Sequence, residues 1–245
     1  MRAGGRASRG HLGRALRLVG AGAGAAGERG HDVARVAPAG LDPKKKTVAA
    51  SERNETERAA WRTVMQMRDA ARFIFVDEAG THLALSPRYA WAPRGQRAHG
   101  QVPRNWGKNT TLLAGLSLRG VQAPWTGEGA IDTAAFEVYI EQVLCPTLQP
   151  GDVVIIDNLS VHKAARIRDL IEACGGELVY LPAYSPDLSP IEEAFSKIKT
   201  ILRQVSARTR EALLDGIARA LDAITPSDAL GWFTHAGYRS LSLAL

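Results

Sequence analysis

Short apolar runs separated by polar turns recur along the chain from about residue 70. Residues 72–77, with Phe-Ile-Phe-Val, and 152–157, with Val-Val-Ile-Ile, are too short for helices and too apolar for exposed strands. They therefore predict buried strands. The pattern predicts further strands at about 82–85, in an Arg/Gly-rich hairpin near 91–100, at 110–118 and at 178–181. The early strands follow one another directly, which predicts an antiparallel meander of three strands.

Apolar positions with a 3.6-residue period predict helices before, between and after these strands. They fall within 51–70, from 133 to about 146, at 163–174, from 190 to about 204, from 209 to about 224, and from 227 to about 234. The order β-β-β-α-β-α-β-α predicts an α/β fold with a mixed five-stranded sheet flanked by helices. Three strands are antiparallel, and the last two join in parallel through right-handed crossovers. In this topology the first and fourth strands can be neighbours.

Composition divides the chain into four expected parts. Residues 1–42 are rich in Gly, Ala and Arg and are expected to be disordered. Residues 43–70 are expected to form a lead-in helix and linker, 71–206 the main domain, and 207–245 a helical extension packed on it.

Charge and cysteine usage narrow the classes of function. The net charge is +6, but residues 1–47 hold ten Lys/Arg against three acids, and 48–245 hold 21 against 22. A nucleic-acid contact by the main domain must therefore come from local patches. No apolar run approaches the roughly 18–20 residues that span a bilayer, so no membrane segment is expected. Cys145 and Cys174 lack the spacing of a zinc site and are expected to be reduced thiols.

Three acids occupy positions suited to metal-dependent chemistry. Asp77 and Asp157 each end a predicted buried strand, and Glu192 follows Asp157 after 34 intervening residues, at the start of a predicted helix. Carboxylates are ligands that Mg²⁺ prefers, and two such ions can drive phosphodiester cleavage. Each acid also has a simpler interpretation. Both Asp residues fit turns, and Glu192 fits a capping box that begins at Ser189.

The segments around these acids resemble the DDE transposases of bacterial insertion sequences related to the mariner superfamily. The similarity lies in residues 76–80, 156–158 with His162 and Lys163, and 184–192 (Tyr-Ser-Pro-Asp-Leu-Ser-Pro-Ile-Glu), and extends over about 43–240. The resemblance implies an RNase H-like fold, in agreement with the predicted element order. It also implies that Asp77, Asp157 and Glu192 form a catalytic triad that holds two Mg²⁺ or Mn²⁺ ions.

The resemblance further implies cleavage and strand transfer at the ends of an insertion sequence. The partner would be double-stranded DNA, with a homodimer expected, in the bacterial cytoplasm at the nucleoid. The family's helix-turn-helix is not evident in residues 1–42. Two alternatives therefore stay open, namely a catalytically idle DNA-binding remnant of a truncated transposase, or another RNase H-like nuclease.

Further residues complete the expected site. Glu193 is a rival to Glu192, although its place one residue too late and the nearby Lys197 favour an ordinary helix pair. Glu78 is expected to point away from Asp77, because side chains alternate along a strand. The expected DNA contacts are Arg94, Arg97, Arg104, Lys108, His162 and Lys163.

Overall fold

The structure, a computed structural model, describes residues 50–159, 162 and 165–240. The segment 1–42, with its expected disorder, and Lys163 lie outside the described residues. Within them, no helix is long and apolar enough to cross a membrane.

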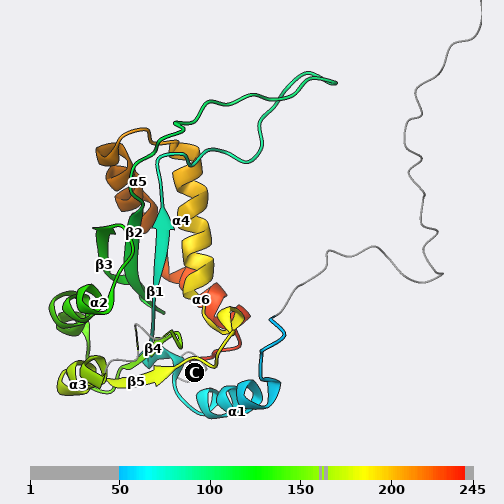
Figure 1. The fold of residues 1–245 in the computed structure, drawn as a ribbon. Coiled ribbons are helices and arrows are strands. Elements are labelled where there is room, and N and C mark those ends of the chain that lie inside the picture. Colours follow the sequence, from blue (N-terminus) through cyan, green and yellow to red (C-terminus); the bar gives the residue numbers. More distant parts are fainter. Residues whose placement is uncertain (1–49, 160–161, 163–164, 241–245) are drawn as a thin grey trace, which may run out of the picture. The chain divides into compact units, whose positions relative to one another are not determined.

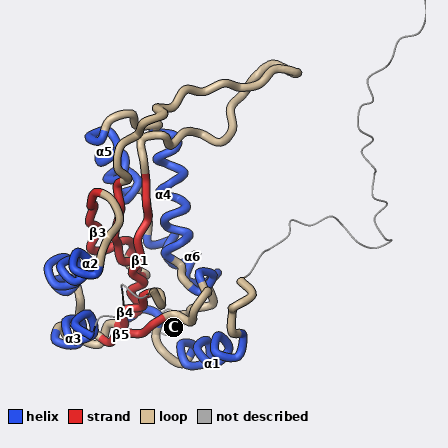
Figure 2. Tube along the Cα trace, viewed as in Figure 1, coloured by secondary structure: helices blue, strands red, loops and turns tan. Residues whose placement is uncertain are grey.

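Five strands form one mixed sheet (Figures 1 and 2). They are β1 (Phe73–Thr81), β2 (Thr110–Ser117), β3 (Gly120–Glu128), β4 (Val153–Ile156) and β5 (Glu177–Tyr180). Their spatial order is β3-β2-β1-β4-β5. The pairs β1–β2 and β2–β3 are antiparallel, and the pairs β1–β4 and β4–β5 are parallel. This confirms the predicted mixed sheet and the predicted neighbourhood of the first and fourth strands.

Two of the predicted strands are wrong. No strand forms at 82–85 or near 91–100, since β1 ends at Thr81 and β2 begins at Thr110. Residues 82–109, here named the arm, form a long irregular loop drawn in tan at the top of Figure 2. The third strand is instead β3, which the apolar pattern did not predict. It lies at the sheet edge, and its pairing with β2 shifts register between Leu113 and Gly115, opposite Pro124. A proline is tolerated at such edges and bulges.

Helices follow the predicted order. They are α1 (Glu55–Gln66), α2 (Thr133–Tyr139), α3 (Ala165–Ala173), α4 (Ile191–Val205), α5 (Arg210–Asp222) and α6 (Pro226–His235). Helix α2 continues into a π-helical turn, Ile140–Leu144, and a 3₁₀ turn, Cys145–Thr147. Shorter 3₁₀ turns are found at Ala70–Arg72 and Pro186–Leu188.

The sheet separates two hydrophobic cores because its side chains alternate. Phe73 and Phe75 of β1 belong to a core shared with α4, α5 and α6, whereas Ile74 and Val76 belong to one shared with α2 and α3. Figure 1 shows α2 and α3 on one side of the sheet and α4 and α6 on the other. Continuing the alternation places Asp77 on the α4 side. Each buried Phe or Ile contributes about 1.5–3 kcal/mol, so the strand that positions this acid is firmly anchored.

Candidate metal-binding active site

Asp77 and Asp157 lie beside each other on neighbouring strands. Asp157 directly follows β4, whereas Asp77 lies inside β1 and is paired with Ala114 of β2, so the prediction that Asp77 ends its strand is wrong. Val76 of β1 is paired in parallel register with Ile156 of β4, so the residue after each is an aspartate. Ile155, two positions before Asp157, lies in the α4-side core. Both carboxylates therefore start from the same face of the sheet, the face that α4 covers.

Glu192 lies in the first turn of α4, and its carboxylate is not used as a helix cap. The residue that caps α4 is Pro190, and no side chain makes a capping hydrogen bond there. The capping-box interpretation of Ser189 and Glu192 is therefore wrong. Glu192 is exposed, and its side chain is available to the space above the two aspartates.

All three acids line one pocket of about 340 Å³, here named the carboxylate pocket. Its remaining walls come from the segments that follow β4 and β5: Val76, Asn158, Leu159, Leu181, Pro182, Ala183, Tyr184, Ser185, Pro186 and Ser189. The acids line it without converging. Among the described residues, no three His, Cys, Asp or Glu side chains lie close enough together to hold a metal ion as they stand.

Both aspartates already accept hydrogen bonds within the protein. Asp77 Oδ1 accepts a hydrogen bond from the backbone N–H of Glu78 at 2.8 Å. Asp157 Oδ1 accepts one from the N–H of Leu159 at 3.1 Å and also contacts His162 Nδ1.

The electrostatics of the pocket suit a divalent cation. Burial raises the pKa of Asp77 to about 7, and the negative charges of Glu192, Asp157 and Glu78 add to the rise against the hydrogen bond from the Glu78 amide. Several carboxylates in one pocket disfavour their joint ionisation. A hard divalent ion prefers such oxygen donors and relieves their repulsion, so the residues present fit Mg²⁺ or Mn²⁺.

His162 lies beneath the pocket rather than at its mouth. Its side chain is 1% exposed, contacts Asp157 through Nδ1, and lies 3.5 Å from Glu78 Oε2 through Nε2. Burial opposes its charge, but the hydrogen bonds to Asp157 and Glu78 outweigh it and raise the pKa to about 9. A buried imidazole held between two carboxylates cannot contact DNA, so that expectation for His162 is wrong.

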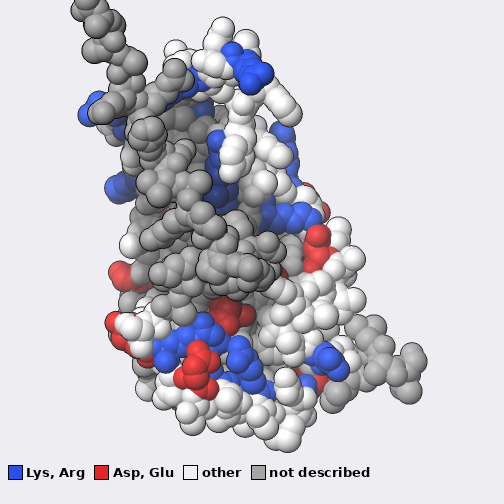
Figure 3. All heavy atoms as spheres, turned by 90° about the vertical axis from the view of Figure 1, so that its right-hand side faces the viewer, with Lys and Arg blue, Asp and Glu red and all other residues white. Residues whose placement is uncertain are grey.

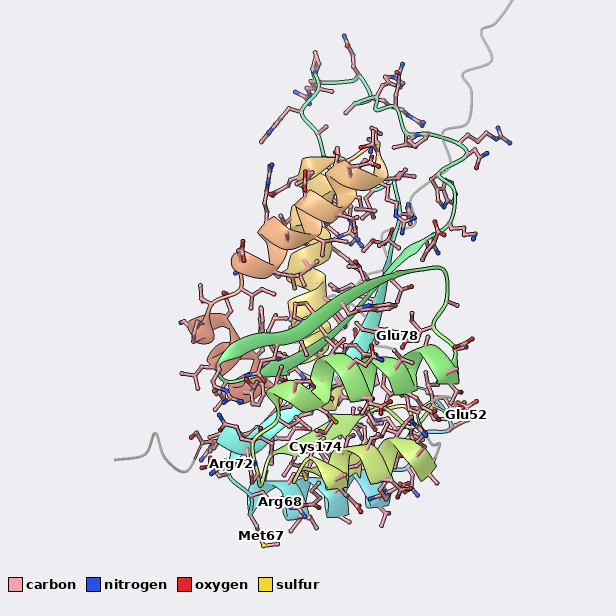
Figure 4. All side chains as sticks on the ribbon, turned by 90° about the vertical axis from the view of Figure 1, so that its left-hand side faces the viewer. Glu52, Met67, Arg68, Arg72, Glu78 and Cys174 are labelled. Carbon is pink, nitrogen blue, oxygen red and sulfur yellow. The ribbon has the colours of Figure 1, made fainter. Side chains whose placement is uncertain are left out.

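Glu78 confirms the predicted alternation along β1. It points to the α2 and α3 side, the side that faces the viewer in Figure 4, where it reaches His162. The imidazole therefore links the Glu78 carboxylate to Asp157 across the end of the sheet.

Asp187, in the motif before Glu192, binds arginines and is not a candidate metal ligand. Arg58 of α1 donates two hydrogen bonds to its carboxylate, at 3.1 and 2.7 Å, and Arg53 donates a third at 3.0 Å. Arg58 is fully buried. On the other side, the Tyr238 hydroxyl donates to the Leu188 carbonyl at 2.6 Å. Two segments distant in the sequence thus fix the turn that leads into α4.

Glu193 is bound elsewhere. Its carboxylate contacts His235 Nδ1 at 2.8 Å, and it does not line the carboxylate pocket. Lys197 pairs with Asp228 at 2.7 Å and not with Glu193, so the predicted helix pair is wrong. The geometry favours Glu192 over Glu193 as the third acid.

The expected DNA contacts on the arm are exposed. Arg94, Arg97 and Arg104 are exposed, while Lys108 lies 3.5 Å from Glu128. Trp91 is fully exposed on the same arm. Sequence reasoning missed Arg58 and the role of Asp187, because no local pattern marks a contact between residues 129 positions apart.

Comparison with solved structures finds the same fold in the Mos1 mariner transposase. The crystal structure of the Mos1 paired-end complex with Mn matches with a TM-score of 0.62 and 20% identity, over 80% of this chain and 64% of that chain. The Mos1 strand transfer complex matches with a TM-score of 0.61 and 19% identity, over 81% and 63%. The chain thus spans less than two thirds of these transposase chains. The likeness shows the RNase H-like fold.

Comparison with curated protein sequences gave no match. A family model, described as the DDE superfamily endonuclease, matches residues 72–214, which is more than half of the chain and includes all three acids. The chain therefore belongs to the DDE superfamily endonucleases.

Proposed function

We propose that the protein is the catalytic domain of a transposase, which cleaves DNA strands at the ends of a bacterial insertion sequence and joins them to target DNA. The observation that supports this best is the single pocket lined by Asp77, Asp157 and Glu192 at the edge of the sheet. In this proposal, residues 71–206 are the catalytic domain, 207–245 its helical extension, and the protein acts at the nucleoid.

The three acids would hold two Mg²⁺ or Mn²⁺ ions. When bound, such ions activate the attacking hydroxyl and stabilise the leaving oxygen of an in-line displacement at phosphorus. The chain's own residues orient the acids. His162 contacts Asp157 from beneath, and the Arg58–Asp187 pair fixes the turn that precedes Glu192. No covalent intermediate with the protein is required.

The partner in this proposal is double-stranded DNA, both the element's ends and the target. Arg94, Arg97, Arg104 and Lys108 of the arm would contact its phosphates, with Lys163 as a further contact predicted from the sequence alone. Exposed cations supply affinity without reading base sequence. A homodimer would bring two ends together.

The test is divalent-dependent nicking of DNA that carries the element's ends. Wild type should nick with Mg²⁺ or Mn²⁺ and not with EDTA, and Asp157→Asn should lose nicking while still binding DNA. Equal nicking by both proteins would refute the triad. DNA binding without nicking by wild type would favour an idle DNA-binding remnant.

A further inference from the structure

A second groove adjoins the carboxylate pocket and has Glu192 in common with it. It has a volume of about 490 Å³ and lies between the arm and one face of α4. Its lining residues are Pro87, Arg88, Tyr89, Glu192, Phe195, Ser196, Lys199, Thr200, Arg203 and Gln204, here named the α4 groove. The groove therefore continues directly from the site of the proposed chemistry.

The α4 wall is one stripe of the helix. Lys199 and Arg203 follow Glu192 by seven and eleven residues, spacings that return to the same helical face. At a rise of 1.5 Å per residue, they lie roughly 10 and 16 Å along the axis from Glu192. Two cations thus mark a straight path that leads away from the acids.

The cations of this groove form no ion pair with the described residues. Within the part of the chain that the structure describes, no carboxylate forms an ion pair with Arg88, Lys199 or Arg203. Lys197, on another face of the same helix, is neutralised by Asp228 at 2.7 Å. In Figure 3, Lys and Arg atoms predominate in the upper part of the face that bears α4 and the arm, and Asp and Glu atoms lie mainly lower. Facing cations without partners favour a polyanion.

The opposite wall is held in place from within the domain. Arg208, in the turn between α4 and α5, donates to the carbonyls of Leu83 and Leu85 at 3.0 Å each, and to that of Gln101 at 3.3 Å. One guanidinium therefore ties both limbs of the arm at its base. The wall at 87–89 begins only a few residues beyond, and it presents Tyr89 with 92% of its surface exposed.

We propose that the α4 groove binds an unpaired DNA strand that continues from the phosphate held at the carboxylate pocket. Lys199 and Arg203 would contact its phosphates and Tyr89 would stack on a base, the combination that binds single strands. A volume of this order suits a nucleotide-sized ligand. A duplex is too large for it, since its major groove alone is about 12 Å wide. This inference rests on the proposed function, because it takes DNA as the substrate.

The test measures binding of two labelled DNAs in EDTA by fluorescence anisotropy, one a blunt duplex and the other the same duplex with a short single-stranded overhang. The full chain should bind the overhang DNA about tenfold more tightly. Tyr89→Ala should remove at least about fivefold of this preference. The double variant Lys199→Gln with Arg203→Gln should remove the preference. It should also reduce the slope of log K against log salt concentration for overhang binding by about 1.4, or 0.7 per lost phosphate contact.

Lys197→Gln is the matched control, since it removes a charge from the same helix outside the groove. It should keep the preference. Thermal unfolding confirms that each variant folds, which the surface positions favour. The proposal that the α4 groove binds an unpaired strand would be overturned if wild type bound both DNAs equally. It would also be overturned if the control and the double variant lost the overhang preference equally. Nicking without an overhang preference would overturn only the proposal for the α4 groove. An overhang preference without nicking would overturn only the proposed function.

Discussion

The carboxylate pocket and the α4 groove meet at Glu192 but differ in how their charged side chains are held. Asp77 lies within β1 and Asp157 directly follows β4, strands whose side chains are buried in the two cores, and each aspartate accepts a hydrogen bond from the protein. In the groove, Lys199 and Arg203 have no ion-pair partner among the described residues.

This difference teaches which part of the function is built into the fold. Acids that must be placed accurately are anchored by strand register and hydrogen bonds, which set the direction from which each carboxylate starts. Cations that follow a flexible polyanion need only accessibility and charge. Removing a group from the pocket should therefore have a large, all-or-none effect, and removing one from the groove or arm a small, graded effect.

The largest expected effect separates two adjacent glutamates. Glu192→Gln should lower metal-dependent nicking by at least about 100-fold, because even changes beyond the metal's own ligands cost 10–100-fold. Glu193→Gln should stay within a few fold of wild type, since Glu193 contacts His235. Single-turnover nicking rates of the two variants measure this. The reverse pattern would move the third acid to Glu193.

A second prediction concerns the ion pair beneath the turn that leads to Glu192. Asp187→Asn leaves the fully buried Arg58 without its main partner, which should lower the free energy of unfolding by about 2 kcal/mol. This is below the roughly 3–5 kcal/mol of a fully buried pair, because Asp187 is 46% exposed and Glu55 remains near Arg58. Urea unfolding measures it, and Arg168→Gln, in the exposed pair with Glu172, is the control. An equal, small loss in both would show that the pair contributes little.

The same pair gives a pH dependence. Burial opposes ionisation of Asp187, but the hydrogen bonds and charge of Arg58, with Arg53, outweigh it and lower the pKa below the usual 3.8. A carboxyl whose pKa is lowered in the folded state stabilises the fold at pH values above its usual pKa. This stabilisation is lost as the pH falls through the folded-state pKa. The stability difference between wild type and Asp187→Asn should be full at pH 7 and shrink below about pH 4. A difference independent of pH would contradict the ionic origin.

The smallest expected effect lies on the arm. Arg94→Gln with Arg97→Gln should weaken duplex binding only a few fold at physiological salt, and lower the salt slope by about 0.9 per lost phosphate contact. Arg68→Gln, near the start of β1 in Figure 4 and paired with Glu177, should leave the slope unchanged. Binding isotherms at several salt concentrations measure both. An unchanged slope in the arm variant would place duplex contacts elsewhere.

How much of the fold the sequence could predict differs between the central strands and the edge strand. The strands before Asp77 and Asp157 were predictable, because a strand buried on both faces needs an apolar run and parallel strands need a crossover. The edge strand β3 was not, since an edge strand tolerates Pro124 and needs no such run.

Contacts across the chain were also beyond prediction from the sequence. Nothing local distinguishes Arg58 from its exposed neighbours, although it is the buried partner of Asp187. Likewise His162 was expected to face DNA. Its burial involves Phe136, whose ring centroid lies 4.3 Å away, and the sequence does not show this contact. Such residues are recognised only once the elements are packed.

The central claim is that Asp77, Asp157 and Glu192 together hold the divalent ions. A crystal of the protein soaked in Mn²⁺, with its anomalous difference map, tests this most directly. The account predicts peaks in the carboxylate pocket, with oxygens of all three acids at about 2.0–2.3 Å, near the ideal Mg²⁺ distance. Peaks bound by Glu193, or none in the pocket at saturating Mn²⁺, would contradict it.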